Sequence, residues 1–134
     1  MAGMVCTITH QRHRPIKTVR FDWLSDDAAG TATGTTVPVI SGQILRIDWI
    51  PGATTPSDLY DTTLKDDDGV DVMCGLGENC PNGAIQTEVP VLTNGAAGNM
   101  APVVVDSKLK LDVAAAGNAK TGTVVVYYRG DAED

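Results

Sequence analysis

The chain has 134 residues, 43% of them hydrophobic, and a formal net charge of −7, which suits one folded domain with a single core. The negative charge argues against a nucleic-acid binder, because such proteins normally carry a basic face. No segment approaches the roughly 20 apolar residues of a membrane span, and residues 1–14 lack the apolar run of a signal peptide. We therefore expect synthesis in the cytoplasm and neither a nucleic-acid nor a membrane partner.

The composition favours strands over helices. Aromatic residues make up only 4% of the chain and glutamate occurs three times, whereas threonine, valine and glycine are abundant. β-branched residues pack well on a pleated sheet, and no window shows a capped period of about 3.6 residues. The core must then come mainly from valine, isoleucine, leucine and alanine.

Alternation of apolar and polar residues recurs along the chain and predicts half-buried strands. In chain order the expected strands are Val5–His10, Lys17–Trp23, Thr35–Ile40, Gln43–Trp49, Asp58–Leu64, Val70–Cys74, Ala84–Val91, Pro102–Val105, Lys108–Val113 and Thr123–Tyr128. Segments rich in Gly, Asn, Asp and Pro separate them and predict turns, one of them at residues 93–99 (TNGAAGN).

Many short strands at regular spacing predict an all-β fold, a single antiparallel β-sandwich that is jelly-roll-like and spans residues 1–134. An N-terminal arm over about residues 1–16 and a frayed acidic tail over residues 130–134 complete the expected domain. The apolar members of the alternating runs should form the core: Val19, Phe21, Trp23, Leu45, Ile47, Trp49, Leu64, Val70, Val72, Leu109, Leu111, Val126 and Tyr128.

The pattern Arg, apolar, Asp, Trp occurs twice, at residues 20–23 and 46–49. If the two strands paired antiparallel with Phe21 opposite Ile47, each arginine would face the aspartate of the other strand. Each such ion pair would contribute a fraction of a kcal/mol. Coincidence is the alternative, since a strand with one polar face often carries both residue types.

Residues 64–71 (LKDDDGVD) place four aspartates around Gly69. A calcium loop of the EF-hand type needs ligands at positions 1, 3, 5 and 12 around a glycine at position 6, but positions 1 and 12 would fall on Leu64 and Gly75. A hairpin explains the pattern better, because Asp-Gly favours a tight turn and apolar residues alternate on both sides of it. We expect a hairpin turn, followed by a loop over residues 75–83 (GLGENCPNG).

The three cysteines do not indicate a disulfide framework, because their number is odd. Cys74 and Cys80 are spaced more widely than the ligand pairs of common zinc sites, and zinc would require them to meet Cys6, His10 and His13. A disulfide between Cys74 and Cys80, formed outside the cytoplasm, is a further alternative. Free thiols, no metal and no cofactor are the expectation.

No arrangement typical of an enzyme is present in the sequence. His10 and His13 are the only candidate bases for neutral pH, and both lie in a basic stretch. The chain lacks a nucleophile elbow, a P-loop and a dinucleotide fingerprint. The carboxylates mark turns and outer strand faces rather than a paired site. We therefore expect a non-catalytic protein.

The charges are unevenly distributed along the chain. Four basic residues cluster near the start, whereas residues 58–71 and 131–134 are acidic. Such asymmetry suits contacts between surfaces of opposite sign, and Pro15 should separate an exposed arm from the strand that starts at Lys17. The predicted interface residues are Arg12, His13, Arg14 and Lys17. The alternative is a solvated strand end without a binding role.

Two segments carry a resemblance to a known group. The runs LYDTTLKDDDGVDVMCGLGENC and LKLDVAAAGNAKTGTVVVYYRG resemble small tailed-phage virion structural proteins of the capsid cement, or decoration, type. The shared pattern consists of Leu59-Tyr60-Asp61, then Asp68–Asp71, a glycine-rich loop and a closing hairpin from Leu109 to Tyr128. It covers roughly the second half of the chain and includes no catalytic residue.

The resemblance implies a non-enzymatic cement protein on the capsid surface of a virion, made in the host cytoplasm. Its expected partners are the major capsid protein and further copies of itself, in a dimer or trimer. The alternative function is a small β-sandwich module of a phage tail, neck or fibre that binds a host glycan or protein. The low number of aromatic residues disfavours a glycan site, which usually needs them at its surface.

Overall fold

The computed structural model describes residues 3–37, 39–93 and 100–130. These residues form eleven β-strands and no helix, so none of them belongs to a helix that could cross a membrane. The predicted all-β class is confirmed, and every strand pair is antiparallel. The strands are β1 (Val5–Gln11), β2 (Ile16–Leu24), β3 (Ala32–Thr35), β4 (Ile40–Pro51), β5 (Asp61–Lys65), β6 (Gln86–Glu88), β7 (Val91–Thr93), β8 (Met100–Pro102), β9 (Val104–Ser107), β10 (Lys110–Ala114) and β11 (Thr121–Arg129).

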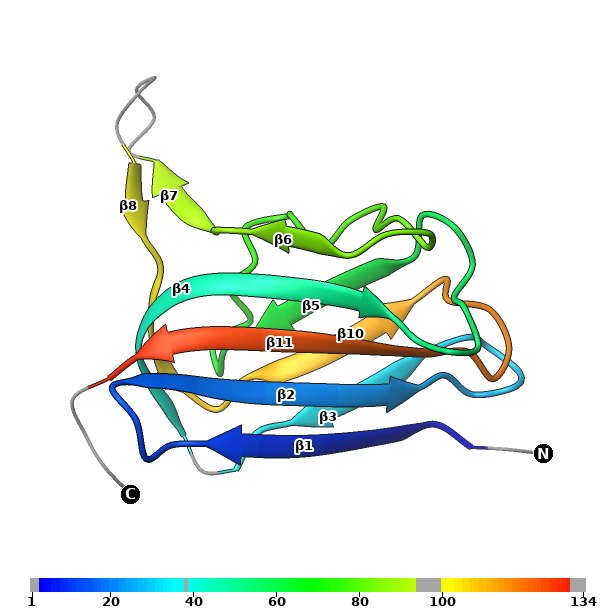
Figure 1. The fold of residues 1–134 in the computed structure, drawn as a ribbon, viewed down its shortest axis with the longest axis horizontal. Coiled ribbons are helices and arrows are strands. Elements are labelled where there is room, and N and C mark those ends of the chain that lie inside the picture. The colour runs from blue at the N-terminus through cyan, green and yellow to red at the C-terminus, as the bar shows by residue number, and fades with distance from the viewer. Residues whose placement is uncertain (1–2, 38, 94–99, 131–134) are drawn as a thin grey trace.

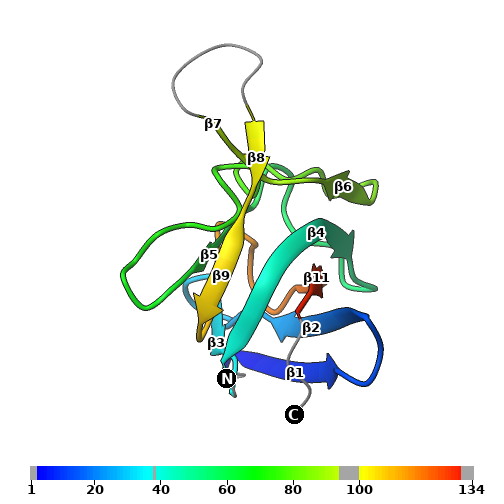
Figure 2. The ribbon, with the colours of Figure 1, turned by 90° about the vertical axis from the view of Figure 1, so that its left-hand side faces the viewer.

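The main sheet has the order β1-β2-β11-β4-β6, and β9 pairs with the first part of β4. This sheet is curled into a half-barrel, so that β4, β11, β2 and β1 follow an arc when the molecule is viewed end-on (Figure 2). A three-stranded sheet, β3-β10-β5, lies behind it in Figure 1, and the short pair β7-β8 projects from the body.

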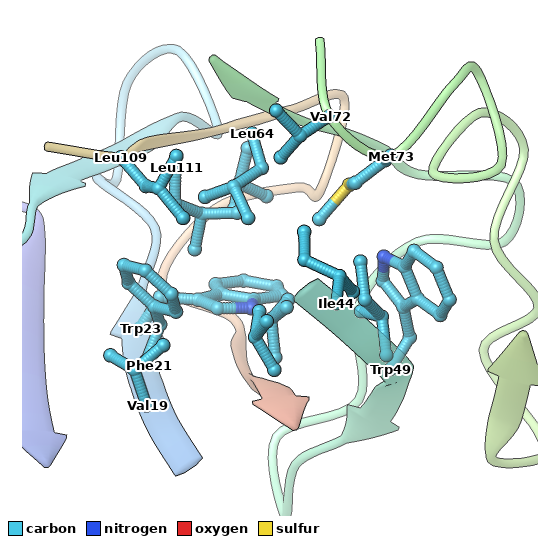
Figure 3. Close-up of a cluster of buried hydrophobic side chains, with 14 of the residues drawn as sticks. Val19, Phe21, Trp23, Ile44, Trp49, Leu64, Val72, Met73, Leu109 and Leu111 are labelled. Atoms are coloured by element: carbon cyan, nitrogen blue, oxygen red, sulfur yellow. The ribbon is translucent and has the colours of Figure 1, made fainter. Parts of the chain in front are cut away.

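The core fills the space between the two larger sheets. Strand β2 alternates strictly, with Val19, Phe21 and Trp23 buried on its inner face. Figure 3 shows these side chains facing Leu64 and Leu111 of the smaller sheet. Valines, isoleucines and leucines supply most of the buried residues, as the composition predicts. Burial of such side chains contributes about 1.5–3 kcal/mol each.

Two predicted core residues lie elsewhere. Leu45 is only half-buried, because the register of β4 against β11 shifts between Tyr127 and Tyr128. Tyr128 pairs with Ile44 and Tyr127 with Arg46, so Leu45 is the extra residue of a β-bulge, and Ile44 takes its place in the core. Val70 is 56% exposed at the tip of the turn after β5.

The turn at residues 66–70 is present, but the strand predicted over Val70–Cys74 is not. The Asp66 amide donates to the Val70 carbonyl at 3.0 Å, and Gly69 has φ +84°. After a single bridge between Lys65 and Asp71 the chain enters successive turns. The Asp71 carboxylate explains the change, since it accepts hydrogen bonds from the amides of residues 64, 73 and 75 and thereby competes with a strand ladder.

The boundaries of other predicted strands also change. Predicted Thr35–Ile40 covers the end of β3, the connection and the start of β4. Predicted Ala84–Val91 divides into β6 and the start of β7, and the predicted Pro102–Val105 divides between β8 and β9. The predicted turn at residues 93–99 and the acidic tail fall largely outside the described residues, since residues 94–99 and 131–134 are not described.

The closing hairpin expected from Leu109 to Tyr128 does not form. Strand β10 pairs with β3 and β5, whereas β11 pairs with β2 and β4, so the chain crosses from one sheet to the other. Residues 115–120 make this crossing with Ala115, Gly117 and Ala119 in the left-handed region. The Ala116 amide bonds to the Gly30 carbonyl and its carbonyl accepts from Ser57. These bonds hold the connection against neighbouring loops.

The strand predicted over Val5–His10 is confirmed as β1, within the segment also expected to form an N-terminal arm. Residues 5–11 pair with β2 along their whole length, from Val5 opposite Leu24 to Gln11 opposite Thr18. The inner side chains of Cys6 and Ile8 pack against the core, which explains why this segment joins the sheet. Residues 12–15 are the connection between β1 and β2, at the left of the main sheet in Figure 1.

Candidate functional site

The outer face of the main sheet carries ordered charges. Arg20 pairs with Asp22 at 3.1 Å within β2, and Arg46 pairs with Asp48 at 3.2 Å within β4. The repeated Arg, apolar, Asp, Trp pattern therefore has a structural counterpart, but the cross-strand ion pairs considered as one explanation do not form. Strand β11 lies between β2 and β4, so each arginine pairs with the aspartate two residues further along its own strand.

Strand β11 lies between these charged strands, and the middle of its outer face is almost inaccessible to solvent. Val125 lies opposite Arg20 on one side and Asp48 on the other, and it is only 6% exposed although it faces outward. Thr123 donates a hydrogen bond to Asp22 at 2.6 Å. The charged side chains are thus tied to the sheet and to one another, which reduces the entropy that they lose when a partner binds.

An aromatic ring marks the end of this face near the β1–β2 connection. The Arg46 guanidinium lies 4.2 Å from the centre of the Tyr127 ring, a cation–π contact. Tyr127 first, and then the Asp48 carboxylate, raise the pKa of Arg46. The bulge places Leu45 beside the same ring, so an apolar and a basic side chain from β4 both reach it.

Two shallow hollows flank Tyr127. One of about 400 Å³ is lined by Gln11, Arg14, Pro15, Ile16, Thr18 and Tyr127. The other, of about 340 Å³, is lined by Ile16, Leu45, Arg46 and Tyr127. Apolar and aromatic side chains and two arginines, Arg14 and Arg46, line these hollows together. We call the residues Arg14, Ile16, Leu45, Arg46 and Tyr127 the outer patch.

The structure separates the four residues predicted for an interface. Arg14 belongs to the outer patch, and His13 is exposed beside it on the same connection. Arg12 is half-buried and lies near His10 and Tyr128. Three of the four therefore lie on one turn, but only Arg14 reaches the hollow.

Lys17 has a structural role instead of a surface one. Its side chain is buried, with 4% exposure, and its ammonium group donates to the carbonyls of Arg14 and Gly130 at 3.3 Å each. The residue alternates with the outward-facing Ile16 and Thr18, which puts it on the inner face of β2. Lys17 thus fastens the β1–β2 connection to the end of β11 and is not available to a partner.

His10 lies on the inner face of the edge strand β1. Burial first, and the Arg12 guanidinium second, lower the pKa of His10, while a backbone hydrogen bond with Val37 opposes them. The imidazole is therefore neutral at pH 7. His13 lies three residues further along, on the connection between β1 and β2, and its side chain is exposed.

The thiols are protonated at neutral pH. Burial raises the pKa of Cys6 and of Cys80 to about 11 each, and the pKa of Cys74 is raised by partial burial and by Asp71. All three are free. Among the residues that the structure describes, no three His, Cys, Asp or Glu side chains gather in a way that could hold a metal ion.

Sequence reasoning missed most of the outer patch, although part of the signal was present. Alternation in the segment VVVYY places Tyr128 in the core, and the same alternation puts Tyr127 on the opposite, outer face. Ile16 follows from the same parity on β2. Nothing in the sequence indicates that these two residues become neighbours, because they lie more than a hundred positions apart.

No protein-family model, no curated protein and no solved structure matches this chain.

Proposed function

We propose that the protein is a non-enzymatic structural component of a phage virion, a capsid cement that binds the outer surface of the shell. The observation that carries this proposal is the outer patch, which combines apolar side chains with two arginines on a chain of net charge −7. A surface of this kind excludes water at its centre and meets carboxylates at its edge, as protein–protein contacts do. The major capsid protein is the proposed partner.

Two further features support a role as a binding part. The resemblance of residues 59–80 and 109–130 to virion proteins of the cement type agrees with the outer patch in pointing to a structural contact. Two side chains of the patch are held in place: Arg46 by its ion pair with Asp48, and Arg46 and Tyr127 by their cation–π contact. Side chains that are already ordered bind with a small ordering cost, and a weak contact repeated over a shell gains strength through multivalency.

The proposed architecture is a jelly-roll-like β-sandwich. The two larger sheets enclose a common core, and the crossing from β10 to β11 changes sheets, as connections in such folds do. In this proposal the protein is made in the host cytoplasm and is finally located on the capsid surface. It needs no cofactor and has no catalytic role.

The second candidate is a tail, neck or fibre module that binds a host-surface glycan or protein. Tyr127 favours it, since an aromatic ring beside a shallow hollow is typical of a sugar site. Arg46 weakens this reading, because its guanidinium already lies over the ring. A glycan array separates the two: specific signals that a soluble sugar competes away would favour the second candidate.

Quantitative mass spectrometry of purified particles tests the proposal directly. A cement protein follows the symmetry of the shell and is present in many copies, in a fixed ratio to the major capsid protein. A ratio typical of a few copies per particle would place the protein in the neck or tail, and its absence from particles would reject the virion role.

A further inference from the structure

Strand β1 is the long edge strand of the main sheet, and Gly34 of β3 lies against its inner side chains. It has seven residues and pairs with β2 on one side, and within the described residues no strand pairs with its other side. Its side chains alternate between an exposed outer face and a half-buried inner face, so the inner face is only partly covered at this edge. Figure 1 shows it at the lower border of the sheet.

The opposite edge of the same sheet is protected in the usual ways. Strand β6 has three residues, contains Glu88 and is followed closely by Pro90, and β9 has four residues and contains Asp106. Short length, charge and proline all prevent one edge from pairing with another chain. Strand β1, with the sequence VCTITHQ, has no acidic residue, no lysine or arginine, no proline and no bulge.

We propose that β1 pairs antiparallel with β1 of a second copy of this chain. This inference does not depend on the proposed function. An antiparallel pair of identical strands has two-fold symmetry, the commonest symmetry of homo-oligomers. Centred on Ile8, it places Thr7 of each copy opposite Thr9 of the other, on the exposed face. Threonine pairs are favourable across strands, and no like charges meet.

The charges at the two ends of β1 fit this arrangement. Continuing the register, residue 13 of the second copy lies level with residue 3 of the first, and Asp26 lies at the same level beyond β2, since Val5 pairs with Leu24. These positions are separated by two strand spacings, about 10 Å. The long side chain of the neighbouring Arg14 covers part of that distance. The basic connection of each copy therefore lies at the same level along the sheet as the loop that carries Asp26 and Asp27 in the other, twice per dimer.

Asp26 keeps its charge in that position. Its carboxylate accepts hydrogen bonds from the amides of Ala29 and Gly30 at 2.6 and 2.7 Å, and the bonds to these and neighbouring amides, the one from Ala29 first, lower its pKa. The contact would be electrostatic and partly solvated, so it serves orientation and register more than affinity.

Sedimentation of the full chain at increasing concentration tests the pairing. We expect wild type to reach twice the 14.0 kDa of the monomer. The double variants T7K/T9K and T7E/T9E should each have a dimer dissociation constant at least about tenfold higher than that of wild type. Like charges then face each other twice across the pair of strands. An equimolar mixture of the two should restore dimers, since lysine then faces glutamate. T87K, on the exposed face of the opposite edge strand β6, is the matched control and should associate like wild type.

Three outcomes would overturn the inference. They are a wild type that stays monomeric at every concentration, a dimer that T7K/T9K leaves unchanged, and a mixture of the charge variants that does not recombine. Circular dichroism verifies that the variants are folded. Amide hydrogen exchange adds an independent readout, since protection in residues 5–11 should rise with concentration while protection in β6 should not.

Discussion

Among single residues, Thr62 connects the core to the loop over residues 75–80. Its hydroxyl accepts a hydrogen bond from the Trp49 indole at 2.8 Å and lies 3.2 Å from the Gly77 carbonyl, to which it donates. Thr62 and Trp49 are both buried, at 1% exposure each. Removal of the Thr62 hydroxyl therefore leaves the indole N–H without a hydrogen-bond acceptor, because water cannot reach it. Such a group costs about 1–3 kcal/mol.

We therefore expect Thr62→Val to lower the free energy of unfolding by about 1–3 kcal/mol, although valine preserves the shape and favours strands. Urea unfolding followed by tryptophan fluorescence measures it. Thr63→Val, the same change on the half-exposed face of β5, is the control and should change stability by less than about 0.5 kcal/mol. Equal effects of the two variants would contradict the role of the hydroxyl.

His10 makes stability depend on pH. Its folded pKa lies below the ordinary value of 6.5, so between the two pKa values the unfolded chain binds more protons. The contribution of the neutral imidazole is fully present above pH 6.5 and decreases as the pH falls through the folded pKa. We expect unfolding midpoints of His10→Gln to vary less between pH 7.5 and pH 5.5 than those of wild type.

The exposed histidine offers a matched control for this measurement. His13→Gln removes an imidazole from the solvent-exposed connection three residues away and should retain the pH dependence of wild type. A slope for His10→Gln that equals the slope of wild type would show that burial of His10 has no part in acid sensitivity.

Among elements, the packing of β2 against β11 depends on a glycine at one position of β11. Gly122 lies opposite Trp23, and a Cβ atom at Gly122 would overlap the Trp23 indole. The ring also lies 5.7 Å from the ring of Tyr60, so it has little freedom to move away. The missing side chain on β11 is therefore a condition for the packing of the largest residue of β2.

Gly122→Ala should destabilise the fold by about 1–3 kcal/mol, the usual cost of overpacking, and should change the near-ultraviolet spectrum of the tryptophans. Thermal unfolding measures the first effect and circular dichroism the second. Gly83→Ala is the control, because a Cβ atom there meets nothing within 4 Å and the backbone needs no left-handed conformation. A Gly122→Ala variant as stable as Gly83→Ala would contradict the packing described for Trp23.

Strands with strict alternation could be predicted from the sequence, and β2 and β10 agree with their predicted ranges within two residues. The failures occur where one side chain overrides the period. The bulge at Leu45 moves that residue out of the core, and the Asp71 carboxylate ends a strand that the alternation of Val70 and Val72 predicts. Neither a bulge nor a side-chain bond to the backbone leaves a mark in the spacing of apolar residues.

For the whole molecule, the order of strands decides where a site can form. The outer patch combines the start of β2, the bulge of β4 and the end of β11, and the order β2-β11-β4 does not follow from the sequence. The charge along the chain predicted interface residues on the β1–β2 connection, and one of them, Arg14, lines a hollow of the patch. It also included Lys17, because a buried lysine and an exposed one look alike in a sequence.

The arginines of the outer patch and the acidic turn after β5 belong to different sheets. The outer patch lies on the outer face of the main sheet, whereas the aspartates of residues 66–71 follow β5, in the other layer (Figures 1 and 2). A protein with such polarity approaches an acidic surface with one preferred face. The proposed cement role requires that face to be the outer patch.

Binding of the purified protein to undecorated shells tests this central claim most directly. We expect R14E/I16E, which places two carboxylates in the outer patch, to lower occupancy on shells at least tenfold while the protein stays folded. The matched control K65E/V70E makes equivalent changes of charge at two exposed positions, the last residue of β5 and the turn that follows it, and should bind like wild type. Equal loss in both variants would indicate a general effect of net charge, and full occupancy by R14E/I16E would contradict a shell contact through the outer patch.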